Sequence, residues 1–325
     1  MAGKNKTKPL QADICRGFFE TNKLTNADFA DFSDFSDFSD FANFANQHNC
    51  IIGICDALPL TTEKSRLSAA KTPFVTPNIE KRINPTLALP TAKSVIVLGK
   101  PYLPSPHKNL SSLGCGTDYH VTIKNLLKKL LQLLDCKNLN CKNSVKSVIM
   151  VDSGNLAERA FAVKAGLGFW GRNNMVISPK LGSFFNIGLL IVDIPLPTTP
   201  ATAAISECPQ NCNRCIQACP TNALKPYFLD VSLCTSYITQ KKGTLTEPEQ
   251  TLIGDQLFGC DICQLCCPFN KVDKTSAKNT DIISDILNMQ QKEFDQQFGK
   301  TALAWRGLTQ LQRNANIIAG NKNKS

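Results

Sequence analysis

From residue 49 onward, apolar positions group into short continuous runs and longer amphipathic stretches. The continuous runs predict four buried strands, at residues 50–56, 94–99, 145–151 and 184–192. Residues 119–134 have apolar side chains at i, i+3 and i+4 spacing, which predicts an amphipathic helix with its lysines outward. Residues 156–165 predict another helix, with Gly166 directly after its last turn. Strands that alternate with helices indicate a layered α/β (α+β) domain over residues 49–204.

The pattern breaks down before residue 49, where a triplet repeat places phenylalanine at every third position of residues 28–46. On an α-helix a period of three drifts by about 60° per repeat, so the six rings would wind around the whole helix. The period fits no strand either. We therefore expect residues 1–48 to be a low-complexity or disordered segment without a catalytic role. The alternative is a phenylalanine-rich docking segment.

The last part of the chain, residues 276–325, is predicted to be helical. Two helices are expected, near residues 279–291 and 301–318, and Gly320 is expected to end the second.

The fifteen cysteines of the chain narrow the range of functions that it can have. The N-terminus has early lysines but no apolar core typical of an export signal, so we expect a cytoplasmic protein. In a reducing compartment, cysteines favour metal or redox use over disulfides. No run approaches the ~18 apolar residues of a membrane span. The formal charge of +10 permits a nucleic-acid partner but is equally explained by solubility.

Eight of the cysteines lie in two runs over residues 205–275. The first run is Cys208, Cys212, Cys215 and Cys219, followed by Pro220. The second is Cys260, Cys263 and Cys267, followed by Pro268, with Cys234 between the runs. Two Cys-Pro endings are typical of a bacterial-ferredoxin-like module with two 4Fe-4S clusters. The alternative is structural zinc, which C-x-x-C pairs also bind.

In such runs, three cysteines hold one cluster and the cysteine before proline reaches the other cluster. This rule predicts that cluster one is held by Cys208, Cys212, Cys215 and Cys267. It predicts that cluster two is held by Cys219, Cys234, Cys260 and Cys263. Cys266 is left over. Three residues separate Cys208 from Cys212 where two are usual, which leaves open whether Cys208 is a ligand.

Asp152 is the candidate for acid chemistry, because it stands where a predicted strand ends. Apolar walls around its carboxyl group would raise its pKa and make it a proton donor. The alternatives are that Asp152 caps the following helix or pairs with a lysine. Gly166, Gly168 and Gly171 suggest a backbone that approaches a flat cofactor closely. They follow a predicted helix rather than a strand, which excludes a dinucleotide fingerprint.

Residues 82–320 resemble the epoxyqueuosine reductase family of cobalamin-dependent iron–sulfur enzymes, which are related to reductive dehalogenases. The resemblance rests on RINPTLALPTAKSVIVLGKPY (82–102), GTDYH (116–120), VDSGNLAERAFAVKAGLGFWGRNN (151–174), GSFFNIG (182–188), CIQACPTNAL (215–224), LDVSLCTSYITQKKG (229–243), GCDICQLCCPFN (259–270) and GKTALAWRGLTQLQRNANIIAG (299–320).

The resemblance implies a two-electron reduction of epoxyqueuosine to queuosine in tRNA, with Asp152 as the proton donor. It implies cobalamin contacts at Arg82, Val176, Ile187, Ser236, Cys260 and Asp261. It also implies a tRNA contact near Lys242, an external electron donor such as flavodoxin or ferredoxin, and a monomer that does not bind membranes.

Two departures from the family lie on the substrate side. The chain ends about five residues after Gly320, without the family's helical-repeat extension, and TEKSRLSAAKTPFVTPNIEKR replaces an aromatic, glycine-bearing segment. We therefore keep two alternatives: a paralogue that reduces another substrate with the same cofactors, and a ferredoxin-like electron carrier without corrin.

Overall fold

A four-stranded sheet forms the centre of the first lobe. The computed structural model describes residues 39–69, 74–105, 107–137, 144–200, 207–271 and 282–322. The strands are β1 (Ile51–Asp56), β2 (Ser94–Pro101), β3 (Ser147–Met150) and β6 (Phe185–Val192). Their order is β1-β2-β6-β3 and every neighbouring pair is antiparallel. The four strands expected from the apolar runs are confirmed.

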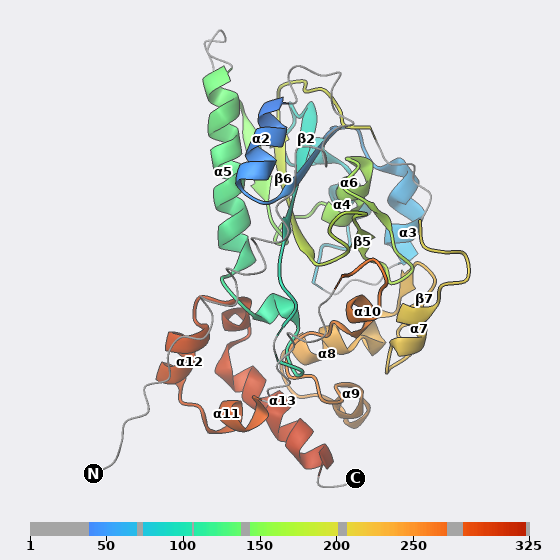
Figure 1. Cartoon of the computed structure of the whole chain (residues 1–325), viewed down its shortest axis with the longest axis vertical. Coiled ribbons are helices and arrows are strands. Elements are labelled where there is room, and N and C mark those ends of the chain that lie inside the picture. Colours follow the sequence, from blue (N-terminus) through green and yellow to red (C-terminus); the bar gives the residue numbers. More distant parts are fainter. Residues whose placement is uncertain are drawn as a thin grey trace.

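Both faces of this sheet are covered by helices, because successive strand residues point to opposite faces. In β2, Ile96 and Leu98 face α2 (Ser39–Gln47) and α5 (Tyr119–Lys137). Val95 and Val97 face the opposite layer, which contains α4 (Ile79–Ile83) and α6 (Glu158–Lys164). Figure 1 shows α5 standing along one side of the sheet and α6 on the other. Each fully buried Val, Leu or Ile contributes about 1.5–3 kcal/mol to stability. The expected layered fold is confirmed.

Helix α2 corrects the expectation that residues 1–48 lie outside the globular part. Phe41, Phe44 and Ala45 are buried in the core beside α5. The drift of a three-residue period becomes large only over several turns. Within the two turns of α2, positions i, i+3 and i+4 still share one face. The earlier part of the repeat lies outside the described residues.

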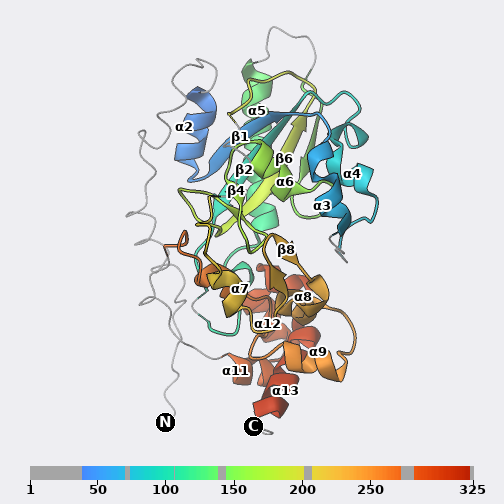
Figure 2. The same cartoon turned by 90° about the vertical axis from the view of Figure 1, so that its right-hand side faces the viewer.

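The second lobe is helical and has a hydrophobic core of its own. Its helices are α8 (Thr235–Gln240), α9 (Glu247–Leu252), α11 (Ile283–Asn288), α12 (Gln291–Phe298) and α13 (Gly307–Lys322). Figure 2 shows this lobe below the sheet lobe, with the cysteine-bearing segment between them. The expected C-terminal helices are confirmed in part: α11 lies within the expected residues 279–291, α12 was not expected, and α13 begins later than expected and continues past Gly320 to Lys322.

Shorter elements connect the two lobes. On the sheet side they are η2 (Thr61–Glu63), α3 (Lys64–Ala69), η3 (Pro85–Leu87), η4 (Ser112–Gly114), β4 (Phe169–Trp170) and β5 (Val176–Ile177). The cysteine-bearing segment contains α7 (Arg214–Ala218), β7 (Leu224–Lys225), β8 (Phe228–Leu229), η5 (Val231–Leu233) and α10 (Ile262–Leu265), and η6 (Ala302–Trp305) precedes α13. No helix in the described ranges has both the length and the apolar character needed to cross a bilayer.

The approach of β1 to the end of α6 gives a test of the packing. A Cβ atom on Gly53 would clash with the carbonyl oxygen of Ala165 and with the Leu167 side chain. We expect Gly53→Ala to lower the free energy of unfolding by about 1–3 kcal/mol, the usual cost of overpacking. Urea denaturation measures this. The control is Gly320→Ala, where a Cβ atom meets open space within a helix and alanine should be neutral or stabilising. Equal stability of the two variants would contradict this packing.

Candidate active site

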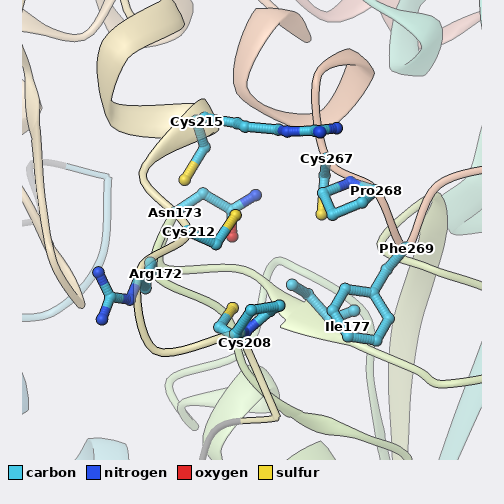
Figure 3. A pocket seen from close by; sticks show the side chains of 11 residues that line it. Arg172, Asn173, Ile177, Cys208, Cys212, Cys215, Cys267, Pro268 and Phe269 are labelled. Atoms are coloured by element: carbon cyan, nitrogen blue, oxygen red, sulfur yellow. The ribbon is translucent and has the colours of Figure 1, made fainter.

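Four cysteines from the two runs line one pocket. They are Cys208, Cys212, Cys215 and Cys267, and in Figure 3 their sulfur atoms point toward a common space. Ile177 and Phe269 close its apolar side. Within the described residues, no three His, Cys, Asp or Glu side chains are placed to hold a single metal ion. The sulfurs therefore surround a larger space than a zinc ion with thiolates at about 2.3 Å requires, which favours a cubane.

The other four cysteines also lie close to one another. Burial raises the pKa of the Cys260 thiol to about 11, with further contributions from Cys234 and Cys219. Burial also raises the pKa of Cys263 well above its ordinary value, and Cys260 and Cys234 raise it further. Thiols in such a group lose their protons when iron binds them. The structure brings together the two sets that the sequence rule proposed, and the role of each cysteine as a ligand stays a prediction.

Buried hydrogen bonds attach the second cysteine run to the sheet lobe. Asp261, whose residue surface is 7% exposed, accepts hydrogen bonds from the Ser112 N–H and Oγ–H, both at 2.6 Å. Ser183 Oγ donates to Gln264 Oε1 at 2.9 Å, and the Ser183 N–H donates to Asn270 Oδ1 at 2.6 Å. These contacts fix the loop that carries Cys260 and Cys263 against the sheet.

Asp152 directly follows the buried residue Val151 at the end of β3, in a left-handed conformation with φ of 55°. Tyr119 Oη donates to its Oδ2 at 2.8 Å, and His120 Nε2 lies 3.8 Å from the same oxygen. The Asp152 N–H donates to Glu158 Oε1 at 2.6 Å. The Asp152 side chain is 68% exposed, so a substrate can reach it. Neither alternative role holds: within the described part of the chain no lysine pairs with Asp152, and the residue that caps α6 is Ala157.

The pKa of Asp152 moves in the direction opposite to the one expected from the sequence. The nearby His120 ring lowers the pKa most, desolvation of the carboxyl group opposes this, and the hydrogen bond from Tyr119 lowers the pKa further. Polar donors, rather than apolar walls, face the carboxylate and stabilise its charged form.

The raised carboxyl pKa belongs to Glu158 instead. Burial and the charge of Asp152 raise it to about 8. The pKa of His120 is also raised, by Asp152 and by Asp118, whose Oδ1 lies 2.8 Å from His120 Nδ1. At neutral pH Glu158 therefore holds a proton, and His120 keeps its proton to higher pH than an ordinary histidine does.

The glycines of residues 166–171 pack against protein rather than against an open cofactor space. A Cβ atom on Gly168 would clash with the backbone of Ile177, and one on Gly171 with the Ile177 and Asn173 side chains. Gly166 has φ of 75° and ends α6. The expectation that these glycines mark a flat cofactor is therefore corrected: they allow β4 and β5 to pack closely.

The residues expected to contact cobalamin lie in both lobes. Arg82 on α4 is buried, while Val176 on β5 and Ile187 on β6 join the same core on one face of the sheet. Ser236 is half-buried on α8 of the second lobe. Asn173, in the turn before Val176, donates from Nδ2 to the Cys263 carbonyl at 3.3 Å and so joins the two groups. Because Ser112 and Gln264 occupy the Asp261 carboxylate, Asp261 could contribute only its backbone.

Sequence reasoning did not assign roles to Tyr119, His120 and Glu158. The first two stand in the GTDYH motif, and Glu158 begins α6. Their contacts with Asp152 span up to 33 residues of sequence, so only the fold brings them together. Once the fold is known, the shifted pKa values of two carboxyl groups and a histidine that lie together indicate a functional site.

Two groups of cysteines between the lobes, together with an accessible carboxyl group on the sheet lobe, define the class: an iron–sulfur oxidoreductase built on a layered α/β lobe. Residues 207–270 match the family described as 4Fe-4S double cluster binding domain. Residues 82–153 match the family described as Epoxyqueuosine reductase QueG, DUF1730.

Whole-chain comparisons agree. The chain is 36% identical to the epoxyqueuosine reductase of Bacillus cereus, over 81% of this chain and 74% of the relative. It is 35% identical to that of Staphylococcus aureus, over 84% of this chain and 77% of the relative. The solved epoxyqueuosine reductase of Streptococcus thermophilus superposes with a TM-score of 0.75 at 30% identity, over 87% of this chain and 80% of that chain. The chain belongs to the epoxyqueuosine reductase family.

The cysteine assignment can be tested by iron content. We expect Cys208→Ala to retain about half of the wild-type iron after anaerobic reconstitution, because only cluster one loses a ligand. Cys266→Ala is the matched control: it removes a thiol that neighbours Cys212 and Cys215 but is not needed for either set. Iron and sulfide analysis with EPR of the reduced protein measures both variants. Full iron in Cys208→Ala, or loss of iron in Cys266→Ala, would show that the assignment is wrong.

Proposed function

We propose that this protein reduces epoxyqueuosine in tRNA to queuosine, with electrons delivered through two 4Fe-4S clusters to a bound cobalamin. Family membership supports the reaction, and a solved relative at 30% identity is described with a tRNA-Tyr epoxyqueuosine-modified stem loop. The observation that carries the proposal is the Asp152 carboxyl group, which is open to a substrate and has two titratable side chains, His120 and Glu158, beside it.

The residues present suit a cobalamin. Arg82, Val176 and Ile187 would hold it from the sheet lobe, and Ser236 with the backbone of Cys260 and Asp261 from the second lobe. Arg82 lies near Arg159 and Arg66, as their mutual effects on pKa indicate. Several guanidinium groups suit the phosphate and amide groups of a corrin. When bound, cobalamin supplies the low-valent cobalt for the two-electron chemistry, and the protein supplies orientation and protons.

Electron entry is proposed at cluster one. Cys208 and Cys212 are half-exposed there, whereas cluster two adjoins the expected cobalamin contacts. An external donor such as flavodoxin or ferredoxin would therefore dock near Cys208.

Protons are needed because removing an epoxide oxygen as water consumes two electrons and two protons. Asp152 is ionised at neutral pH, so it delivers protons only if its neighbours recharge it. His120 lies 3.8 Å from its carboxylate, and Glu158 hydrogen-bonds to its backbone N–H. We infer that Asp152 passes protons to the oxygen while His120 and Glu158 act as its proton store.

The function is tested by complementation. In a bacterial strain that lacks its own reductase, the wild-type gene should restore queuosine in tRNA, measured by nucleoside mass spectrometry. Asp152→Asn should reduce the rate of the purified enzyme by about 10²–10⁴-fold, as expected for a lost general acid. The matched control, Asp285→Asn, alters an exposed aspartate on α11 and should behave as wild type. If the tRNA keeps epoxyqueuosine although the wild-type enzyme carries both clusters and cobalamin, the proposal is refuted.

The proton store predicts a pH profile. A raised pKa means that Glu158 holds its proton below about pH 8 and loses it above, so the wild-type rate should fall as pH rises through about 8. In Glu158→Gln the amide still accepts from the Asp152 N–H but carries no titrating proton. The decline near pH 8 should therefore be absent from this variant. Single-turnover rates measure this, and an identical profile in both proteins would exclude Glu158 as a proton source.

A further inference from the structure

Three aromatic rings and one guanidinium group form a partly exposed cluster, which we call the aromatic platform: Phe74 and Trp305 are exposed, and Tyr237 and Arg306 are half-buried beside them. The ring centroids of Phe74 and Tyr237 are 5.1 Å apart, and those of Phe74 and Trp305 are 5.9 Å apart. Arg306 Cζ lies 3.4 Å from the centroid of the Trp305 ring. The residues come from three separate segments: the chain after α3, α8, and η6 with the residue that follows it.

The exposure of this platform calls for a partner. Trp305 is 60% exposed and Phe74 is 52% exposed. Single exposed apolar residues are ordinary on protein surfaces, but contiguous patches mark interaction sites. The Phe74 ring meets the Tyr237 ring at an interplanar angle of 54° and the Trp305 ring edge-on at 80°, so three segments far apart in sequence hold these rings in contact before any partner arrives.

The platform lies at the rim of the proposed active site. Tyr237 follows Ser236 on α8, and its backbone N–H hydrogen-bonds to the thiol of Cys234. The same helix ends beside Lys241 and the exposed Lys242, where Arg313 Nη1 donates to the Lys241 carbonyl at 2.7 Å. A molecule held on the platform would therefore reach both the basic end of α8 and the cluster-two region.

The chemistry of the platform suits an unpaired nucleobase. Bases of single-stranded RNA stack on aromatic rings and on arginine planes, and nearby cations bind the phosphates. Arg306 Nε is buried and has no hydrogen-bond partner among the described residues. Its guanidinium plane already lies over Trp305, so a base that extends this stack gains both aromatic and cationic contacts.

We propose that the aromatic platform stacks an unpaired anticodon-loop base next to the wobble position and so holds the RNA at the rim of the site. This rests on the proposed function, because it assumes that the substrate is the anticodon loop. Trp305 would be the principal stacking residue, and Arg306 would act by holding and extending its plane.

Direct binding provides the test. A radiolabelled anticodon stem loop is titrated against the cofactor-loaded protein in filter-binding assays. Trp305→Leu should weaken binding about 5- to 150-fold, the usual range for one lost base stack. Trp305→Phe, which keeps an aromatic face, should retain most of the affinity. The matched control Phe228→Ala removes another exposed aromatic ring, on β8, and should bind as wild type.

Two further measurements use steady-state kinetics and a fluorescent base in the stem loop. Trp305→Leu should raise KM for the stem loop and leave kcat within about twofold of wild type, with unchanged iron content as evidence of intact folding. 2-Aminopurine beside the wobble position should be quenched on binding wild type but not Trp305→Leu.

Equal binding by Trp305→Leu and wild type would overturn the platform proposal, even if wild type reduces epoxyqueuosine. If Trp305→Leu binds RNA as wild type does but accepts electrons more slowly from a flavodoxin-type donor, the proposal is also overturned. The platform would then be a binding site for the donor protein. If Trp305 controls RNA binding but wild type does not reduce epoxyqueuosine, the proposed function fails and the platform stands.

Discussion

The arrangement of this protein depends on the buried hydrogen bonds that join the second cysteine run to the sheet lobe. The Asp261 carboxyl group is buried, no cationic side chain of the described residues pairs with it, and burial raises its pKa. Two hydrogen bonds from Ser112 to one of its oxygens offset that cost. Ser183, Gln264 and Asn270 form a second fully buried connection. Such networks define one geometry, because any shift would leave buried polar atoms without partners. The loop of Cys260 and Cys263 thereby keeps a fixed position relative to the sheet.

That fixed position separates the sources of electrons and protons. The cysteine groups lie between the lobes, whereas Asp152 stands at the end of β3 and draws its partners from α5 and α6. A non-glycine residue with positive φ costs about 1–3 kcal/mol and persists where its surroundings determine it. Here Tyr119 holds the carboxylate and Glu158 holds the backbone N–H. The N-terminus of α5, which begins at Tyr119, also favours negative charge nearby. The ionised Asp152 is a consequence of this setting.

Much of the fold could be predicted from the sequence because its signals are local. Continuous apolar runs gave the four strands, and cysteine spacing grouped the eight thiols as the structure does. What failed depended on tertiary contacts. Phe41 and Phe44 looked like part of a structureless repeat until α5 and the sheet provided a surface to cover. Gly168 indicated a close approach correctly, but only the structure shows that Ile177 is what approaches. The pKa of Asp152 depends on Tyr119 and His120, and the sequence does not reveal that α5 begins beside the end of β3.

The central claim is that electrons from the cysteine-bound clusters and protons from the Asp152 group together remove one oxygen atom from a modified tRNA base. The most direct measurement incubates the reconstituted protein anaerobically with cobalamin, a reductant and an epoxyqueuosine-modified stem loop, and follows the mass of the RNA. The account predicts loss of one oxygen atom per RNA, dependent on cobalamin and abolished in Asp152→Asn. An unchanged RNA mass with both clusters and cobalamin bound would contradict it.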